Sequence, residues 1–488
     1  MQFRTFPIAL SNRLGWSEDR LPPTLAFVVF AAVGLCMPPH NDTWWHLRSG
    51  QEMTRVGSVL LTERFSHTAF GTPLFHNHEW LTQLVFFGLF RLGGAFLLAS
   101  FCAACVIIAV YASWKLVRGS EDVRFALLIV LMLGTVSEWA IRPQVVSLLL
   151  LTIVLHLLNR DRLSWLPILF VAWANLHGVV ILGIAAIVCA VLEAFIWSPM
   201  RLRRTLTTAV LSFAAPMASP LGWHYWPRLV QVLQTVHDLP IQEHQSSFTV
   251  SALPFWLAAA LLLVVVIRHR SDLPNRTASE RTLVIYSVLL AAAAAMSVRN
   301  IAIFFLIACP VFSRMLPTKA SKSRREAPDG RLSLAFVVVV LSLASLVTVY
   351  RWRDKGRYLG WIPMSPEAVH AIRECDDPMF NTFAAGGPLV WWVPERRVFV
   401  DSRGIEAYPL AVLKRSREAD VFGKYQATFD EYHIRCAVVP RHSTMAEQLA
   451  HDVDAHKRYV DDSWAIFSVE ATEGNRFSSR DYSTSKAP

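Results

Sequence analysis

The feature that most constrains this chain is a series of long apolar segments without charged side chains. Residues 94–114 and 332–350 contain no Asp, Glu, Lys or Arg. A helix needs about 20 residues to cross the hydrocarbon core of a bilayer, and both segments are long enough. Charged residues make up only 17% of the chain, against about 25% in soluble domains. The sequence therefore predicts an α-helical polytopic membrane protein.

Basic residues between the apolar segments predict the orientation. They cluster at positions 115–124, 160–162, 201–204, 268–281 and 314–331. Because cytoplasmic loops carry an excess of Lys and Arg, we expect these loops and the N-terminus to be cytoplasmic. Eleven spans are expected, and this odd number places the C-terminus outside. They are 22–38, 94–114, 125–141, 143–158, 164–175, 178–198, 205–218, 254–267, 283–297, 300–314 and 332–350.

The charge balance divides the chain near position 351. Positions 1–351 hold 29 Lys and Arg against 17 Asp and Glu, whereas positions 352–488 hold 18 against 20. We predict a transmembrane domain over 1–351 with a long first outer loop over 39–93. An extracytoplasmic α/β domain follows over 352–470, and then a disordered tail over 471–488. The cell inner (plasma) membrane is the expected location.

The C-terminal domain is predicted from short apolar runs separated by polar segments. Strands are expected at 398–401, 436–440 and 463–468, with helices around 410–432 and 442–456. The Ala385-Gly386-Gly387 sequence predicts a tight turn, because the chain has no Walker or dinucleotide-binding pattern. Cys375 and Cys436 are the only cysteines of this domain, and the sequence leaves open whether they pair.

Polar and ionisable residues recur at the outer ends of the predicted spans. Such residues are costly at membrane depth and usually mark a functional cavity. We therefore predict that separate loops contribute to one cavity at the outer face. The candidate site residues of the membrane domain are Asp42, Trp45, His46, His78, Glu79, Arg142, Asn175, His177, Glu243 and Arg299.

Several of these residues also have ordinary structural explanations. A short helix over 43–56 would be capped by Asp42 or Asn41, and a cap does not exclude a catalytic role. Trp45 fits an aromatic belt at the membrane boundary, and Arg142 either extends to the interface or binds an anion. A second short helix is expected over 79–91. In the C-terminal domain, Asp401 and Arg403 form either a salt-bridged turn or a contact to a carbohydrate acceptor.

The order of the motifs resembles a known superfamily. The chain carries Asp42-Thr-Trp-Trp-His-Leu-Arg-Ser-Gly50, His78-Glu-Trp-Leu81, Arg142-Pro-Gln144, Trp173-Ala-Asn-Leu-His-Gly178, Ser219-Pro-Leu-Gly222 and Arg299-Asn300, with Val398-Phe-Val-Asp-Ser-Arg403 in the tail. This order resembles bacterial membrane proteins related to the GT-C glycosyltransferases, which include polyprenyl- and dolichyl-phosphate sugar transferases. The resemblance implies a GT-C-like helical domain with an outer cavity for a polyprenyl-phosphate-linked sugar.

The resemblance also implies roles for particular residues. A carboxylate of the first outer loop acts in such proteins as a base or a metal ligand, and Asp42 is the matching position. No second Asp is adjacent, so Glu79 would fill any two-carboxylate role. A divalent cation (Mg or Mn) between Asp42, Glu79 and a substrate phosphate stays open, whereas the His-Glu-x-x-His spacing of zinc hydrolases is absent.

Sugar transfer from a lipid phosphate to a hydroxyl needs a base and nearby positive charge. Asp42 and Glu79 meet the first need, and Arg142 and Arg299, with His78 and His177, meet the second. The expected partners are a polyprenyl-phosphate sugar donor, a glycan, lipid or protein acceptor, and the bilayer, without nucleic acid.

Two other function classes fit the sequence. A non-catalytic scaffold for envelope polysaccharide assembly would use the tail as a binding module. A transporter of lipid-linked glycans would require paired repeats with broken helices at the midplane. The polar residues cluster at one face and no duplication is visible, which favours the transferase.

Overall fold

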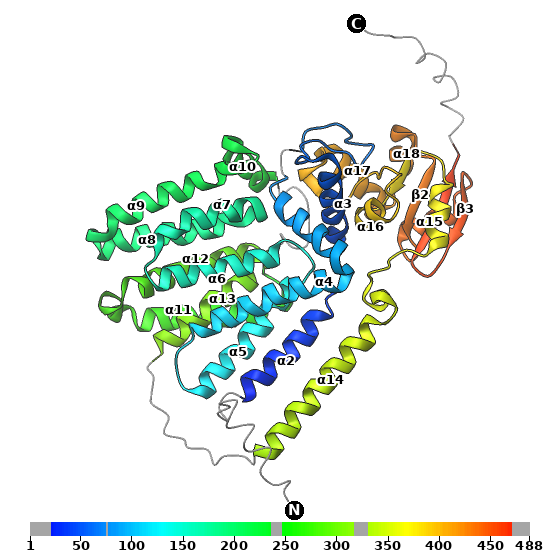
Figure 1. The fold of residues 1–488 in the computed structure, drawn as a ribbon. Helices are drawn as coiled ribbons and strands as arrows, with labels where there is room; N and C mark the ends of the chain where they lie inside the picture. Colours follow the sequence, from blue (N-terminus) through cyan, green and yellow to red (C-terminus); the bar gives the residue numbers. More distant parts are fainter. Residues whose placement is uncertain (1–20, 75–76, 236–245, 317–329, 471–488) are drawn as a thin grey trace, which may run out of the picture. The chain divides into compact units, whose positions relative to one another are not determined.

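The computed structural model describes residues 21–74, 77–235, 246–316 and 330–470. The described chain is mostly helical, with a small sheet near its C-terminal end (Figure 1). It divides into two compact units. The helical unit consists of the residues up to Pro38 together with His78–Leu359. The mixed unit consists of Pro39–Asn77 together with the chain from Gly360 onward.

The helical unit contains the apolar segments that the sequence predicts as spans. Each of those segments overlaps a helix. The helices are α2 (Leu21–Leu35), α4 (Trp80–Lys115), α5 (Glu121–Thr135), α6 (Gln144–Asn159), α7 (Leu166–Leu176), α8 (Ile181–Trp197), α9 (Pro199–Ala214), α10 (Tyr225–Thr235), α11 (Leu253–Arg268), α12 (Ala278–Met296), α13 (Ile301–Met315) and α14 (Gly330–Gly356).

Six helical segments of the described residues are long and apolar enough to cross a membrane. Three shorter apolar helices, Leu21–Leu35, Gln144–Asn159 and Leu163–Leu176, accompany them. Large apolar side chains face outward on this unit, for example Leu92, Phe195 and Leu346, which are 82%, 71% and 65% exposed. Such outward apolar surface is what a helical protein presents to lipid. The chain is thus a helical membrane protein, and the full count of eleven spans stays a prediction.

Helix α4 is two helices joined at a glycine pair. Gly93 and Gly94 have non-helical backbone angles, and Gly94 has a φ of +64°, a conformation that favours glycine. The break separates a first segment from Trp80 to Leu92 from a second that ends at Lys115. The expected helices over 79–91 and 94–114 correspond to these two segments.

Basic loops meet at one end of the helical unit. Arg281 and Arg201 both pair with the buried carboxylate of Glu193, at 2.7 and 2.9 Å. Arg314 donates to Asn159 at 2.8 Å and also to the Leu116 carbonyl. These contacts join the ends of α4, α6, α8, α12 and α13 that carry the basic residues. The other ends of these helices therefore lie at the opposite end of the unit.

The mixed unit is built around a four-stranded sheet in the order β1-β2-β4-β3. Strand β1 (Met379–Asn381) runs parallel to β2 (Cys436–Pro440), and β4 (Trp464–Val469) pairs antiparallel with both β2 and β3 (Ala455–Val460). The remaining helices are α3 (Asn41–Val56), α15 (Pro366–Arg373), α16 (Phe383–Trp392), α17 (Leu410–Phe422), α18 (Gln426–Tyr432) and α19 (Thr444–His451).

Two of the three strand predictions are confirmed, at β2 and β4, and one is wrong. Residues 398–401 form no strand; Val398 makes only an isolated bridge to Ser66 of the first loop. The segment is fully buried all the same, because it packs between the first loop and β1. Thr68 donates to the Phe399 carbonyl at 2.5 Å, and the Asn381 side chain accepts from the Phe399 N–H at 2.8 Å. Burial without sheet pairing explains the strand-like sequence.

The predicted turn at Ala385-Gly386-Gly387 is also wrong, because these residues lie inside α16. The glycines allow close packing instead. A Cβ on Gly386 would lie 2.0 Å from the Val400 carbonyl oxygen, and one on Gly387 would lie 2.1 Å from that of Asn41. Helix α16 therefore packs directly on the start of α3, a helix from the first loop.

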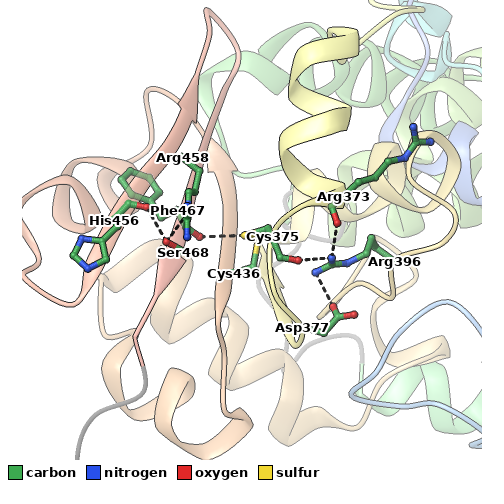
Figure 2. Close-up of a disulfide and its surroundings, with 9 residues drawn as sticks. All are labelled: Arg373, Cys375, Asp377, Arg396, Cys436, His456, Arg458, Phe467 and Ser468. Atoms are coloured by element: carbon green, nitrogen blue, oxygen red, sulfur yellow. Dashed lines mark hydrogen bonds and ion pairs between the residues drawn. A yellow bond between two sulfur atoms is a disulfide. The ribbon is translucent and has the colours of Figure 1, made fainter.

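A disulfide joins Cys375 to Cys436, 61 residues apart (Figure 2). It links the segment before β1 to the first residue of β2. Next to it, Arg396 donates to the carbonyls of Cys375 and Arg373 and pairs with Asp377 at 2.8 Å. The pairing that the sequence left open is present.

Candidate functional site

The centre of the candidate site is a buried carboxylate–imidazole pair in the helical unit. Glu79 directly precedes α4, and His177 directly follows α7 with an extended backbone. The Nε2 atom of His177 lies 3.2 Å from Oε1 of Glu79. His177 is only 3% exposed and Glu79 only 8%. Two residues of the prediction, 98 positions apart (177 minus 79), are thus brought together.

A serine on α6 forms a hydrogen bond with the other ring nitrogen of His177. Ser147 Oγ lies 2.7 Å from His177 Nδ1, and Trp173 Nε1 donates to the same oxygen at 2.7 Å. Because Ser147 accepts from the indole, its own hydrogen is available for Nδ1. The neutral tautomer with its proton on Nε2 accepts from Ser147 at Nδ1 and donates to Glu79 at Nε2. The order Trp173–Ser147–His177–Glu79 fixes the orientation of the carboxylate.

His78 also lies beside Glu79. Its Nε2 lies 3.7 Å from Glu79 Oε1. On the other side, the ring is close to Gly178, where an added Cβ would lie 2.6 Å from His78 Nε2. Glycine at 178 is therefore required for this arrangement of two imidazoles around one carboxylate.

Hydrogen bonds from neighbouring elements position the pair. Asn175 Oδ1 accepts from Trp80 Nε1 at 2.8 Å, and Thr82 donates to the Leu176 carbonyl at 2.6 Å. Both bonds join the end of α7 to the start of α4. Tyr225 donates to the Gly178 carbonyl at 3.1 Å. Asn175 thus has a positioning contact in this structure.

The two predicted arginines lie at the same end of the helical unit as Glu79. Arg142 is buried just before α6, and Arg299 is half-buried between α12 and α13. The end of α6, the start of α12 and the end of α13 meet at the basic loops. Arg142 and Arg299 lie at the other ends of these helices, as Trp80 and Asn175 do on α4 and α7. Glu243 lies outside the described residues.

Asp42, Trp45 and His46 belong to the mixed unit and lie on α3. The cap of this helix is His40 rather than Asp42 or Asn41, and the Asp42 N–H donates to His40 Nδ1 at 3.2 Å. Asp42 instead lies in the first turn, where its carboxylate accepts from Trp45 Nε1 at 3.3 Å. The helix starts earlier than expected because the imidazole provides the cap acceptor. Trp45 and His46 are buried, with ring centroids 3.6 Å apart.

No family model matches the chain, and no curated protein matches it. The resemblance to GT-C proteins therefore stays a prediction, and the site is described by its own geometry.

Asp401 and Arg403 lie in a buried ion cluster of the mixed unit. Arg403 Nε donates to Asp401 at 2.8 Å, and its NH2 group donates to Glu63 at 3.1 Å. Tyr408 donates to Asp401 at 2.9 Å. Burial acts to lower the pKa of Arg403, but the carboxylates of Asp401 and Glu63 raise it well above its ordinary value. The arrangement is the salt-bridged turn, extended by a glutamate from the first loop.

Among the described residues, no group of three or more His, Cys, Asp and Glu side chains is arranged to hold a metal ion. Asp42 and Glu79, the predicted ligands, belong to different units. A divalent cation thus stays a prediction, and no chemical step below depends on it.

Two residues of these clusters escaped the sequence reasoning. Ser147 is one serine within the apolar helix α6, and Glu63 is one glutamate in a polar loop. Neither belongs to a motif. Ser147 lies 30 positions from His177, so its partnership depends on helix packing rather than on local pattern.

Proposed function

We propose that this protein is a membrane glycosyltransferase of the GT-C type. It moves a sugar from a polyprenyl-phosphate donor to a hydroxyl of an envelope glycan, lipid or protein acceptor. The observation that carries the proposal is the Glu79–His177 pair at 3.2 Å, buried at the end of the helical unit opposite the basic loops. A donor carried by the lipid reaches such a boundary by diffusion within the bilayer.

The pair supplies the base that the transfer requires. The acceptor oxygen attacks the anomeric carbon while the bond from that carbon to the phosphate oxygen breaks. The acceptor proton passes to the carboxylate of Glu79, and the lipid phosphate leaves with the electron pair of the broken bond. A positioned base contributes about 10²–10⁴-fold to the rate. His177, fixed by Ser147, orients the carboxylate.

Positive charge near the leaving group is the second requirement. Arg142 and Arg299 lie at the same end of the helical unit as Glu79. A guanidinium group can donate two parallel hydrogen bonds to two oxygens of one phosphate. Stabilisation of charge that develops on the leaving phosphate is usually a large contribution to catalysis. Asp42 lies in the mixed unit, and its role as base or metal ligand stays the prediction that the resemblance gives.

We further propose that the mixed unit and the Glu79 end are extracytoplasmic, in the inner (plasma) membrane of a bacterium. Two independent features support this orientation. The basic loops gather at the opposite end of the helical unit, as the positive-inside tendency requires on the cytoplasmic side. The Cys375–Cys436 disulfide is typical of an oxidising compartment.

Incubation of the purified full-length protein with polyprenyl-phosphate sugars, followed by quantification of released lipid phosphate, tests the proposal. We expect release to depend on acceptor and to fall at least about 100-fold in Glu79→Gln, which removes the proposed base. Glu121→Gln, at an exposed glutamate of the same unit, is the matched control and should retain activity. A protein that binds the donors but never releases lipid phosphate would be a scaffold, contrary to the proposal.

A further inference from the structure

A pocket lined by arginines lies within the mixed unit. Arg48 and Glu52 of α3 line it, with Arg64 and Phe65 of the first loop and Arg396 and Arg397 from the segment after α16. Its volume is about 70 Å³. One water needs roughly 10–15 Å³ by this measure. The pocket thus has room for a small anionic group. We call it the arginine pocket.

Two of the four arginines already have partners. Arg64 pairs with Glu52 at 3.2 Å. Arg396 is held by Asp377 at 2.8 Å and by two backbone carbonyls, as Figure 2 shows. These contacts hold the Arg396 side chain in place. Arg396 therefore forms part of the pocket wall, and we do not assign it to the ligand.

The other two arginines have no carboxylate within 4 Å among the residues that the structure describes. Arg48 donates to the Gln51 side chain at 2.6 Å. The Arg397 guanidinium lies over the Phe70 ring, 3.6 Å from its centroid. Glu52 is the one acidic residue of the lining, and it also accepts from Arg55 at 2.6 Å. Four guanidinium groups and one carboxylate give the lining a formal charge of +3.

Arg48 is half-buried, which makes this excess of charge costly. Burial lowers the pKa of Arg48; Glu52 and the more distant Glu395 oppose this effect without cancelling it, and Arg55 adds to it. A group with several oxygens and more than one negative charge would relieve this cost. A phosphoryl group has three such oxygens, and guanidinium forks match their geometry.

We propose that the arginine pocket binds a phosphoryl group, with Arg48 and Arg397 as its principal ligands. The phosphoryl group is either free, as in inorganic diphosphate, or carried by a lipid. The proposal does not depend on sugar transfer, since binding of the probe is measured without a sugar donor and the Arg48 and Arg397 variants locate it in the mixed unit. It gives the unit of the first loop and the tail a ligand of its own.

Titration calorimetry on the full-length protein in neutral detergent tests the proposal. The probes are inorganic diphosphate and short-chain phosphatidic acid, with phosphatidylcholine of the same chain length as the neutral comparison. We expect one equivalent of diphosphate or phosphatidic acid to bind, and phosphatidylcholine not to bind. Binding of diphosphate indicates a free ligand, and binding of phosphatidic acid alone indicates a lipid source.

Variants of single arginines decide where the anion binds. Arg48→Gln and Arg397→Gln should each weaken binding about tenfold or more, the usual effect of losing a hydrogen bond to a charged group. Arg458→Gln, at an exposed arginine of β3, removes the same charge elsewhere in the unit and should leave affinity unchanged. Arg397 is exposed, so its variant keeps the test valid even if Arg48→Gln does not fold. Absence of binding by both phosphoryl probes, or equal weakening in Arg458→Gln, would overturn the proposal.

Discussion

The guanidinium of Arg403 donates a hydrogen bond of 3.1 Å to the carboxylate of Glu63, a residue 340 positions earlier in the chain. Glu63 is fully buried and also accepts from the N–H groups of Phe65 and Ser66, at 2.7 and 2.8 Å. The first loop and the C-terminal segment therefore fold as one unit around a shared ion cluster. Loss of Arg403 leaves two buried carboxylates without their counterion, whereas loss of Glu63 leaves Arg403 with Asp401 alone.

Replacement of Glu63 should destabilise the mixed unit strongly. Removing one partner of a buried ion pair typically costs about 3–5 kcal/mol. We expect Glu63→Gln to lower the free energy of unfolding by about 3 kcal/mol, the lower end of this range because Asp401 still pairs with Arg403. Denaturant titration of the full-length protein in detergent measures this change. Glu418→Gln removes a half-exposed pair with Arg415 and should cost less than about 1 kcal/mol. Equal effects of the two substitutions would show that the buried pair of Glu63 and Arg403 does not stabilise the unit more than an ordinary surface pair.

His67 should make the stability of the mixed unit depend on pH. Its Nε2 lies 2.9 Å from the Met379 carbonyl oxygen. Burial lowers its pKa, and the hydrogen bond to Met379 acts in the opposite direction without cancelling the effect. The unfolded chain therefore takes up the proton first as pH falls, and stability is lost from about pH 6.5, the ordinary value for histidine, down to the lower folded pKa.

His67→Gln tests this pH dependence because glutamine still donates to the carbonyl but does not titrate. Between pH 7.5 and 5.5 the melting temperature of the wild-type protein should fall further than that of the variant. Parallel pH profiles for the two proteins would show that His67 does not contribute.

The disulfide predicts a simple count of thiols. Five cysteines are free and two are paired, which accounts for all seven. Alkylation of the denatured protein should label five cysteines without reductant and seven after reduction, as read by intact mass. Labelling of seven without reductant, in protein isolated under non-reducing conditions, would mean that Cys375 and Cys436 do not pair in the cell.

The proposed orientation predicts which positions face the outside. A cysteine at Asp462, in the mixed unit, should react with a membrane-impermeant maleimide in spheroplasts. A cysteine at the exposed Glu121, which opens α5 after a basic loop, should react only after permeabilisation. The unsubstituted protein, treated in parallel, gives the background from native thiols. The reverse pattern would place Glu79 on the cytoplasmic side.

Elements with a strong local signal were predictable, and elements that depend on distant packing were not. The apolar segments form helices, and the short apolar run of Cys436–Pro440 forms β2 as expected. The buried run at 398–401 resembles a strand in composition but pairs with the first loop only at one bridge. Gly386 and Gly387 were expected to make a turn, although their function is to admit the backbones of Val400 and Asn41.

The candidate site was predictable to the same extent. Glu79 and His177 are conspicuous because ionisable residues are rare at the ends of apolar segments, and their contact agrees with the expected convergence of loops. Ser147 carried no signal, because one hydroxyl in an apolar helix commonly bonds within its own helix. The partner of Asp401 and Arg403 was equally hidden, since Glu63 approaches them only through the fold of the whole unit.

The most direct test of the account is the rate of lipid phosphate release by Glu79→Gln, compared with Glu121→Gln as the matched exposed control. Glutamine keeps the shape of the side chain and its contact with His177 but cannot accept the proton. We predict that release by Glu79→Gln falls at least about 100-fold, while its melting temperature and donor affinity stay near wild type and the control retains full activity. Undiminished release by a folded Glu79→Gln protein would contradict the role of the Glu79–His177 pair.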